Sequence, residues 1–246
     1  MSTLTLNRPD QYNVLSEEVL AALQQALDAV ADDEGVRVVV LAGRGRAFCA
    51  GHDLRQMRSH PDKDYYRELF ARCGRVMQTL RALPQPVIAR VQGVATAAGC
   101  QLVATCDRAI AAAEARFATS GINLGLFCST PAVAVSRTLQ AKSAFELLTT
   151  GEFIDAPTAE RVGLVNRVVP AAALDASVAE LARSIAAKPP VAVRTGKEMF
   201  YRQLGLPLSE AYAYAGEVMA ENMMADDAIE GIDAFLEKRE PAWRGR

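Results

Sequence analysis

The sequence predicts an α/β fold, because short buried strands alternate with helical patterns along most of the chain. Continuous apolar runs typical of buried strands occur at 36–41 and 87–91. Each run leads into a loop of small residues, and a helical pattern follows. After Pro170 only helical patterns are legible. We therefore expect an α/β core over residues 1–190 and a helical region over residues 191–246.

The first predicted helix follows Ser16, a typical N-cap residue. Glu17 and Glu18 place negative charge in its first turn, where the helix dipole favours it. Apolar side chains at helical spacing continue to Val30 and give this helix one buried face.

The remaining elements follow from the same periodicities and from turn residues. Further short strands are predicted at 4–6, 108–112, 117–119 and 164–169. Helices are predicted at 55–85 with a break at Pro61-Asp62, after Ser129-Thr130 with Pro131 in the first turn, at 141–150 before Gly151, from Asp155 to Gly163, and at about 171–187, 191–204, 208–224 and 227–238.

Two loops of small residues are candidate binding elements. Residues 93–99 contain five Gly or Ala residues in seven positions, between the strand 87–91 and a helical run that begins at Cys100. Strand, tight turn and helix in that order bring unpaired backbone N–H groups to a helix N-terminus, which suits an anion or a developing oxyanion. The alternative is a buried turn that needs small residues only for packing. The second loop, 43–54, follows the strand at 36–41 in the same way.

Composition excludes several other classes of protein. Twenty-seven basic residues face 29 acidic ones, and this balance gives no case for nucleic acid as a partner. No apolar run approaches the ~20 residues of a membrane span, and no signal-peptide pattern is expected at the start. The five cysteines are odd in number and lack C-x-x-C spacing, which predicts reduced core cysteines in a cytosolic (cytoplasmic) protein. With only His52 and His60, no metal site is expected.

The two loops resemble the signatures of the crotonase superfamily, the enoyl-CoA hydratases and isomerases. Residues 47–54 (Ala-Phe-Cys-Ala-Gly-His-Asp-Leu) match one signature, and Gln92-Gly93 through Ala97-Ala98-Gly99 to Cys106-Asp107 matches the other. The resemblance covers essentially the whole chain and is greatest to the enoyl-CoA hydratase domain-containing subgroup. It implies a spiral of ββα units followed by a C-terminal helical trimerisation region, with the family's first hairpin shortened or missing here.

The resemblance also implies an acyl-CoA site, in which coenzyme A enters as part of the substrate and no separate cofactor is needed. The family's two oxyanion donors fall on the backbone N–H groups of His52 and Ala98. Its two hydratase glutamates fall on Gln101 and Gly121, neither of which can act as an acid or base at neutral pH. Possible replacements are the His52 imidazole, Glu152 and the polar residues of 119–129, whereas Asp53 is expected to cap a helix. The residues expected to contact the CoA thioester are Ala50, His52, Asp53, Leu54, Arg55, Ala98 and Lys238.

The sequence therefore predicts a hydratase/isomerase-family protein of fatty-acid or acyl-CoA metabolism that binds an acyl-CoA thioester, with weak or altered hydratase chemistry. The alternative is a non-catalytic acyl-CoA-binding or regulatory protein. A nucleotide-binding protein that uses Gly43-x-Gly45 is disfavoured, because the third glycine of a dinucleotide fingerprint is missing. The expected partners are the acyl-CoA and other copies of the chain, in a homotrimer or a dimer of trimers built on the helices after Pro190. Neither nucleic acid nor a membrane is expected.

Overall fold

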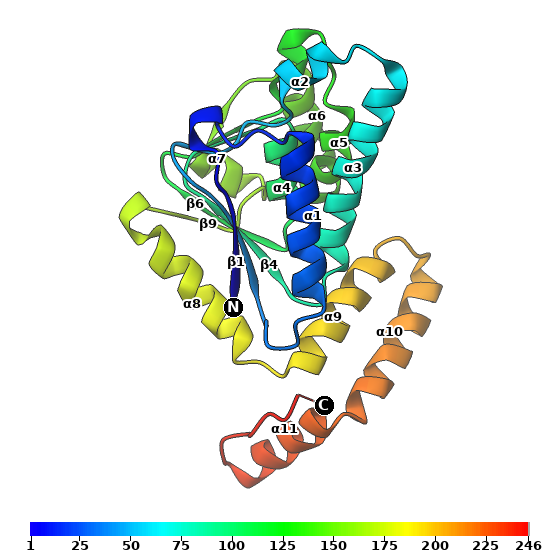
Figure 1. The fold of residues 1–246 in the computed structure, drawn as a ribbon. Helices are drawn as coiled ribbons and strands as arrows, with labels where there is room; N and C mark the ends of the chain where they lie inside the picture. Colours follow the sequence, from blue (N-terminus) through cyan, green and yellow to red (C-terminus); the bar gives the residue numbers. More distant parts are fainter. Residues whose placement is uncertain (246) are drawn as a thin grey trace.

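The computed structural model describes residues 1–245 and contains two sheets surrounded by helices (Figure 1). The first sheet has the strand order β1-β2-β4-β6-β9, and all its pairs are parallel. The second has the order β3-β5-β7-β8, and only the β7–β8 pair is antiparallel. The strands are β1 (Ser2–Leu6), β2 (Val39–Gly43), β3 (Ala47–Cys49), β4 (Val87–Val91), β5 (Val94–Thr96), β6 (Arg108–Ala112), β7 (Arg116–Ala118), β8 (Ile154–Asp155) and β9 (Arg167–Val169).

Successive strands alternate between the two sheets. β2, β4 and β6 join the first sheet, and each is followed within a few residues by β3, β5 or β7 in the second. Helices then return the chain to the next turn. The α/β spiral of ββα units predicted from the resemblance is therefore confirmed.

The helices begin and end close to where the sequence predicts. The Ser16 hydroxyl accepts from the Val19 N–H and caps α1, and Asp62 caps α3 after the predicted break. The segment between β7 and α5, for which no helix is predicted, begins with a short 3-10 helix, η2 (Ser120–Leu124). The α-helices are α1 (Glu17–Ala31), α2 (Leu54–Ser59), α3 (Lys63–Ala82), α4 (Ala98–Thr105), α5 (Ser129–Thr138), α6 (Ala141–Thr150), α7 (Ala156–Arg161), α8 (Leu174–Ala186), α9 (Pro190–Gln203), α10 (Leu208–Met223) and α11 (Asp226–Glu237).

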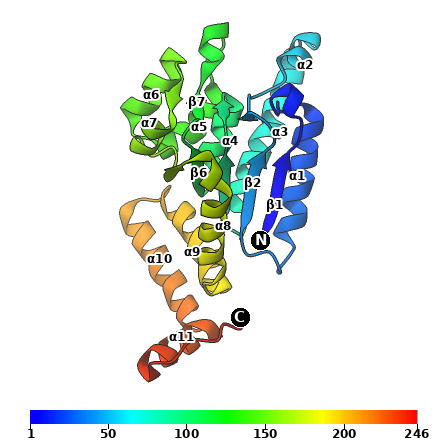
Figure 2. The same ribbon diagram turned by 90° about the vertical axis from the view of Figure 1, so that its left-hand side faces the viewer.

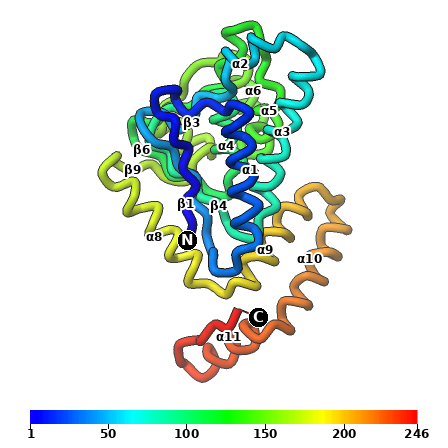
Figure 3. The backbone as a smooth tube through the Cα atoms, viewed as in Figure 1, coloured from blue at the N-terminus to red at the C-terminus, as the bar shows by residue number. Residues whose placement is uncertain are grey.

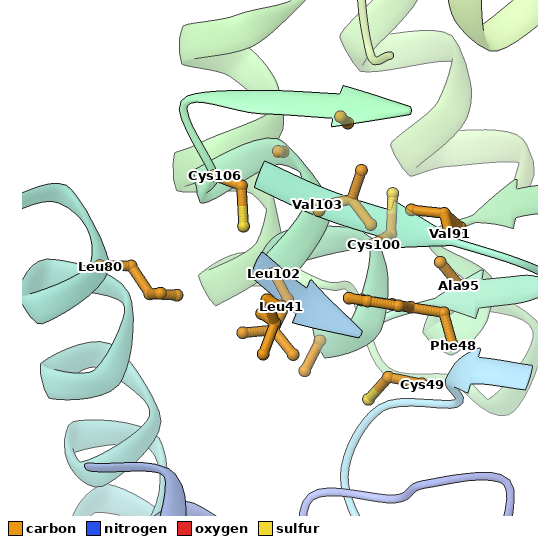
Figure 4. Packing of buried hydrophobic residues seen from close by; sticks show 14 of the residues in the cluster. Leu41, Phe48, Cys49, Leu80, Val91, Ala95, Cys100, Leu102, Val103 and Cys106 are labelled. Atoms are coloured by element: carbon orange, nitrogen blue, oxygen red, sulfur yellow. The ribbon is translucent and has the colours of Figure 1, made fainter. Parts of the chain in front are cut away.

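Helices cover both faces of the first sheet. The side chains on both sides of its strands are therefore buried, which explains why these strands are continuously apolar. Val39 and Leu41 point into the main core with α1, α3 and α4, whereas Val38 and Val40 pack with α8 on the other face. Side chains alternate between the faces because a strand has a period of two. Figure 4 shows how the main core brings together residues from β3, β4, β5 and α4, among them Phe48, Val91, Ala95, Cys100 and Leu102.

The last two helices extend away from this core. α9 lies at the lower end of α3, while α10 and α11 form a projecting arm (Figures 1 and 2). Figure 3 shows the same path as a tube, with a short turn between the end of α8 at Ala186 and the start of α9 at Pro190. Of the described helices, none is long and apolar enough to cross a bilayer.

Candidate functional site

The candidate site lies where three neighbouring strands of the second sheet end. β3, β5 and β7 are parallel neighbours, so their carboxyl ends meet at one edge. The loops that leave this edge contain Gly51-His52, Ala97-Ala98 and Thr119–Gly121. Two hydrogen bonds tie the loops together, from the Ala97 N–H to the Ala118 carbonyl (3.0 Å) and between the Thr96 and Ser120 hydroxyls (2.8 Å). Topology therefore brings together segments far apart in the sequence.

The loop after β3 is held by the segment before α1. The Leu15 N–H donates to the Gly51 carbonyl (2.8 Å), and the Ala50 N–H donates to the Tyr12 carbonyl (3.0 Å). Asn13 is buried beneath this segment, where its amide donates to the carbonyl groups of Arg44 and Ala47. These bonds hold the Gly51–His52 backbone in one orientation.

The loop after β5 has a strained residue at the start of α4. Ala97 has φ 51° and ψ −120°, a combination that costs a residue with a side chain about 1–3 kcal/mol. Gly51 lies against it, since a Cβ built on Gly51 would be 2.9 Å from the Ala97 Cβ and 3.3 Å from the Ala98 nitrogen. The strained turn therefore places the first N–H of α4 beside the Gly51–His52 loop.

Among residues 1–245, neither the His52 N–H nor the Ala98 N–H donates a hydrogen bond to a protein acceptor. Both residues line one cavity of about 180 Å³. Its other walls are mainly apolar, and they come from α2, α3 and the segment between η2 and α5. Unpaired backbone donors in an apolar cavity are suited to a ligand oxygen that develops negative charge.

The His52 side chain also lines this cavity, and its ring contacts Phe70 edge-on with 5.5 Å between centroids. Both ring nitrogens are buried and lack a hydrogen-bond partner among the described residues. Burial lowers the pKa of His52, and the Leu15 backbone opposes this shift more weakly. The imidazole is therefore neutral near pH 7.

Gly121 lies in the cavity wall beside Cys128. A Cβ built on Gly121 would be 2.8 Å from the Cys128 Sγ and 2.6 Å from the Leu126 carbonyl oxygen. Burial raises the pKa of the Cys128 thiol, and the Gly121 backbone partly offsets this. The thiol thus occupies the space into which a side chain at position 121 would project.

The structure does not bring Gln101 into the same cavity. Its side chain lines a second cavity of about 650 Å³, bounded by α3, α4, α5 and α9. It is 4% exposed, and its Oε1 has no hydrogen-bond partner among the described residues. Of the two positions assigned to hydratase glutamates, only Gly121 therefore lies beside the donors.

The residues expected to contact CoA are divided between two parts of the chain. Ala50 and Leu54 line the first cavity. The Asp53 carboxylate caps α2 by accepting from the N–H groups of Arg55 (2.9 Å) and Gln56 (3.1 Å), as predicted for a capping residue. Lys238 lies at the C-terminus of α11, and α11 and α2 are at opposite ends of the molecule (Figure 1).

A buried polar network around Asp107 was missed by the sequence analysis. Lys197 in α9 donates to the Asp107 carboxylate (2.7 Å), and so do the Tyr201 hydroxyl (2.6 Å) and the Val87 N–H (2.6 Å). Lys197 also donates to the carbonyl groups of Leu80 and Gln85. Nothing in the sequence links Asp107 to Lys197, ninety positions apart, although Asp107 ends the second signature.

Within residues 1–245, no three His, Cys, Asp or Glu side chains are grouped closely enough to hold a metal ion. The five cysteines are free and buried. Burial raises the pKa of Cys49, Cys73 and Cys100 to about 12, so these thiols are protonated and unreactive at neutral pH.

Comparison with known families identifies the class of protein. Residues 1–246 match the family described as enoyl-CoA hydratase/isomerase. The chain therefore belongs to the enoyl-CoA hydratase/isomerase family, as its two loop signatures predicted.

Individual relatives agree with this assignment. Mitochondrial enoyl-CoA hydratase domain-containing protein 3 is 44% identical in Xenopus laevis and 43% identical in Homo sapiens, over 98% of this chain and 82% and 79% of those proteins. Among solved structures, an enoyl-CoA hydratase of Mycobacterium smegmatis is 59% identical, with a TM-score of 0.97 over 98% of this chain and 94% of that one. Human enoyl-CoA hydratase domain-containing protein 3 superposes with a TM-score of 0.95 at 44% identity, over 98% and 95% of the two chains.

The cytoplasmic location predicted from the cysteines is wrong by this comparison. The domain-containing protein 3 relatives from five vertebrates carry the word mitochondrial in their names. Free buried cysteines argue against an oxidising compartment but do not distinguish one reducing compartment from another. The cysteine pattern therefore could not support the location drawn from it.

Proposed function

We propose that this protein binds an acyl-CoA thioester and polarises its carbonyl with the backbone N–H groups of His52 and Ala98. One observation carries the proposal. His52 follows a glycine and Ala98 follows a strained alanine; both residues line the same mainly apolar cavity, and neither backbone N–H donates a hydrogen bond to the described residues. Preorganised donors of this kind are each worth about 3–4 kcal/mol to a transition state that carries charge on oxygen. Family membership supports the same chemistry.

Coenzyme A enters this proposal only as part of the substrate, with no separate cofactor. Ala50, Asp53, Leu54 and Arg55 lie next to the His52 donor in sequence and would contact the thioester end of CoA. Lys238 lies at the end of α11, at the opposite end of the molecule from α2, so it would reach a CoA phosphate of a neighbouring subunit. This part of the proposal requires a homotrimer or a dimer of trimers.

Hydration of an enoyl thioester needs acid–base groups as well as an oxyanion site. None of the residues lining the first cavity is an aspartate or glutamate. The protein should therefore hydrate crotonyl-CoA slowly, since each missing acid or base costs roughly 10²–10⁴-fold. Gln101→Glu should give little gain, because the side chain at 101 lines the second cavity. A rate typical of efficient hydratases, measured by the loss of enoyl absorbance, would contradict this prediction.

The missing carboxylates also favour a second candidate, an acyl-CoA-binding protein without turnover. Calorimetric titration with octanoyl-CoA and with crotonyl-CoA, with turnover assayed on the same samples, separates the two. Free CoA is the control for binding through the nucleotide alone. Binding with slow turnover supports an enzyme, and binding without turnover supports a carrier or regulator. If no acyl-CoA binds at millimolar concentration, both candidates fail.

A further inference from the structure

Three helices, α3, α4 and α5, contribute to both cavities. The residues that line the second cavity lie one or two turns further along each of these helices. On α4, Ala98 lines the first cavity, and Gln101 and Thr105 line the second. Residues three and seven positions apart share one face of a helix. The corresponding positions are Phe70 and Met77 on α3, and Pro131 and Ala134 on α5. The two cavities therefore lie beside successive turns of the same three helices.

The second cavity has an apolar interior and a strongly basic wall. Met77, Leu83 and Ala134 contribute apolar surface. Five cationic side chains line the cavity together with a single carboxylate, that of Glu198; the cations are Arg81, Arg137, Arg194, Lys197 and Arg202. This combination suits a ligand with an apolar body and an anionic end.

Two of these cations are available to an anion. Lys197 is already paired with Asp107 at 2.7 Å. Arg137 is exposed, and within residues 1–245 it donates only to the Val133 carbonyl of its own helix (3.0 Å). Arg194 is exposed and forms no ion pair or hydrogen bond with any residue of the described chain. An anion in the cavity would therefore meet two guanidinium groups that form no ion pair with the described residues.

Gln101 lies between the donors and the basic wall. It is buried, and its amide oxygen has no partner among residues 1–245, whereas buried polar atoms normally have one. The two cavities share no lining residue, and Gln101 and Met77 line the second on the helix faces that continue from Ala98 and Phe70. An occupant that spans both would have to pass these two side chains. Both side chains are unbranched and have several rotatable bonds, which makes a shift of either inexpensive.

From this arrangement we infer that the acyl chain of the bound thioester runs along α4 past Gln101 and that a carboxylate at its far end binds Arg137 and Arg194. The substrate class is then the CoA monothioester of a medium-chain α,ω-dicarboxylic acid. Seven residues separate Ala98 from Thr105, which is about 10 Å along a helix axis. A short dicarboxylate therefore cannot reach the arginines. This inference rests on the proposed acyl-CoA site.

The test is a calorimetric comparison of two thioesters of equal chain length. The mono-CoA thioester of octanedioic acid should bind roughly tenfold more tightly than octanoyl-CoA, since one charge-assisted contact is worth about that much. Succinyl-CoA and butyryl-CoA should bind equally. The double variant Arg137→Gln/Arg194→Gln should lose the preference for the dicarboxylate and keep its affinity for octanoyl-CoA. Arg183→Gln removes an exposed arginine of α8 outside the cavity and should keep the preference.

Equal affinities of the two eight-carbon thioesters for the unmodified protein would overturn the inference. A preference that survives in the double variant would also overturn it, and so would an equal loss of affinity for both thioesters. The last result would mean that the arginines bind the CoA moiety instead. If neither thioester binds the unmodified protein, the proposed acyl-CoA site itself fails.

Discussion

Gly121 occupies a position at which the structure leaves no room for a side chain. The obstacle is steric, because the residue does not have a positive φ, but a Cβ there would be 2.6 Å from the Leu126 carbonyl oxygen. We expect Gly121→Glu to lower the free energy of unfolding by about 1–3 kcal/mol, as overpacking does, without raising crotonyl-CoA hydration. Urea denaturation and the hydration assay measure the two effects.

The control is Gly196→Ala in α9, where no heavy atom lies within 4 Å of the added Cβ. That variant should be neutral or more stable by up to ~1 kcal/mol, because alanine favours a helix over glycine. A Gly121→Glu protein with unchanged stability and faster hydration would show that the loop between η2 and α5 opens easily.

His52 should make the stability of the protein depend on pH in the mildly acidic range. Burial holds the pKa of its imidazole below the usual value of 6.5, so the folded state binds fewer protons than the unfolded state below that pH. The stabilisation is therefore fully present above about pH 6.5 and is lost as the pH falls through the lower folded-state pKa. His52→Gln should flatten this part of the Tm profile between about pH 8 and about pH 5.

His60→Gln is the matched change at the other histidine, which is exposed at the end of α2. Thermal unfolding followed by circular dichroism across the same range compares all three proteins. If the profile of His52→Gln falls with acid as steeply as that of the unmodified protein, the buried imidazole is not its cause.

At the scale of elements, α9 is attached to the core through buried charge. Lys197 donates to one carboxylate and to two carbonyl oxygens, one in the last turn of α3 and one in the loop between α3 and β4. Lys197→Met would leave Asp107 buried without a counter-ion, which typically costs about 3–5 kcal/mol. The exposed pair Arg67–Asp64 supplies the control, because Arg67→Met should cost less than about 1 kcal/mol. Equal losses in urea denaturation would contradict a role for Lys197 in docking α9.

Local sequence patterns were sufficient to predict most elements, because caps and periodicity act over a few residues. The helix after Ser16, the strands at 87–91 and 108–112 and the helix at 141–150 begin and end as predicted. The strand predicted at 36–41 instead runs from Val39 to Gly43, because its span depends on pairing with β1 and β4. Its apolar composition alone could not specify that register.

Of the candidate site, only the parts made by backbone groups could be predicted from the sequence. Small residues after two strands indicated loops with free backbone N–H groups, and the family resemblance assigned the donors to His52 and Ala98. Parallel pairing of β3 with β5 brings these two loops together. The direction of the Gln101 side chain depends on how α3, α5 and α9 pack around α4, and no local pattern encodes that packing. The same holds for Lys197 and Asp107, whose contact exists only after α9 docks.

At the scale of the whole molecule, several large apolar side chains of the projecting arm formed by α10 and α11 remain exposed in the single chain. Leu208, Tyr212 and Met219 on α10 are each at least 70% exposed, as are Phe235 and Leu236 on α11. Exposed apolar patches of this kind mark interfaces. The arm therefore supports the prediction of a homotrimer or a dimer of trimers, in which its apolar faces pack against neighbouring copies.

Light scattering at micromolar concentration should give the mass of three or six chains for the unmodified protein. Phe235→Asp adds a charge to the most exposed large side chain of α11, at 81%, and should shift the mass toward one chain because a buried unpaired carboxylate opposes assembly. Phe145→Asp makes the same change on α6, 64% exposed and far from the arm, and should leave the mass unchanged. A monomeric unmodified protein would reject the assembly, and dissociation by Phe145→Asp alone would move the interface from the arm to α6.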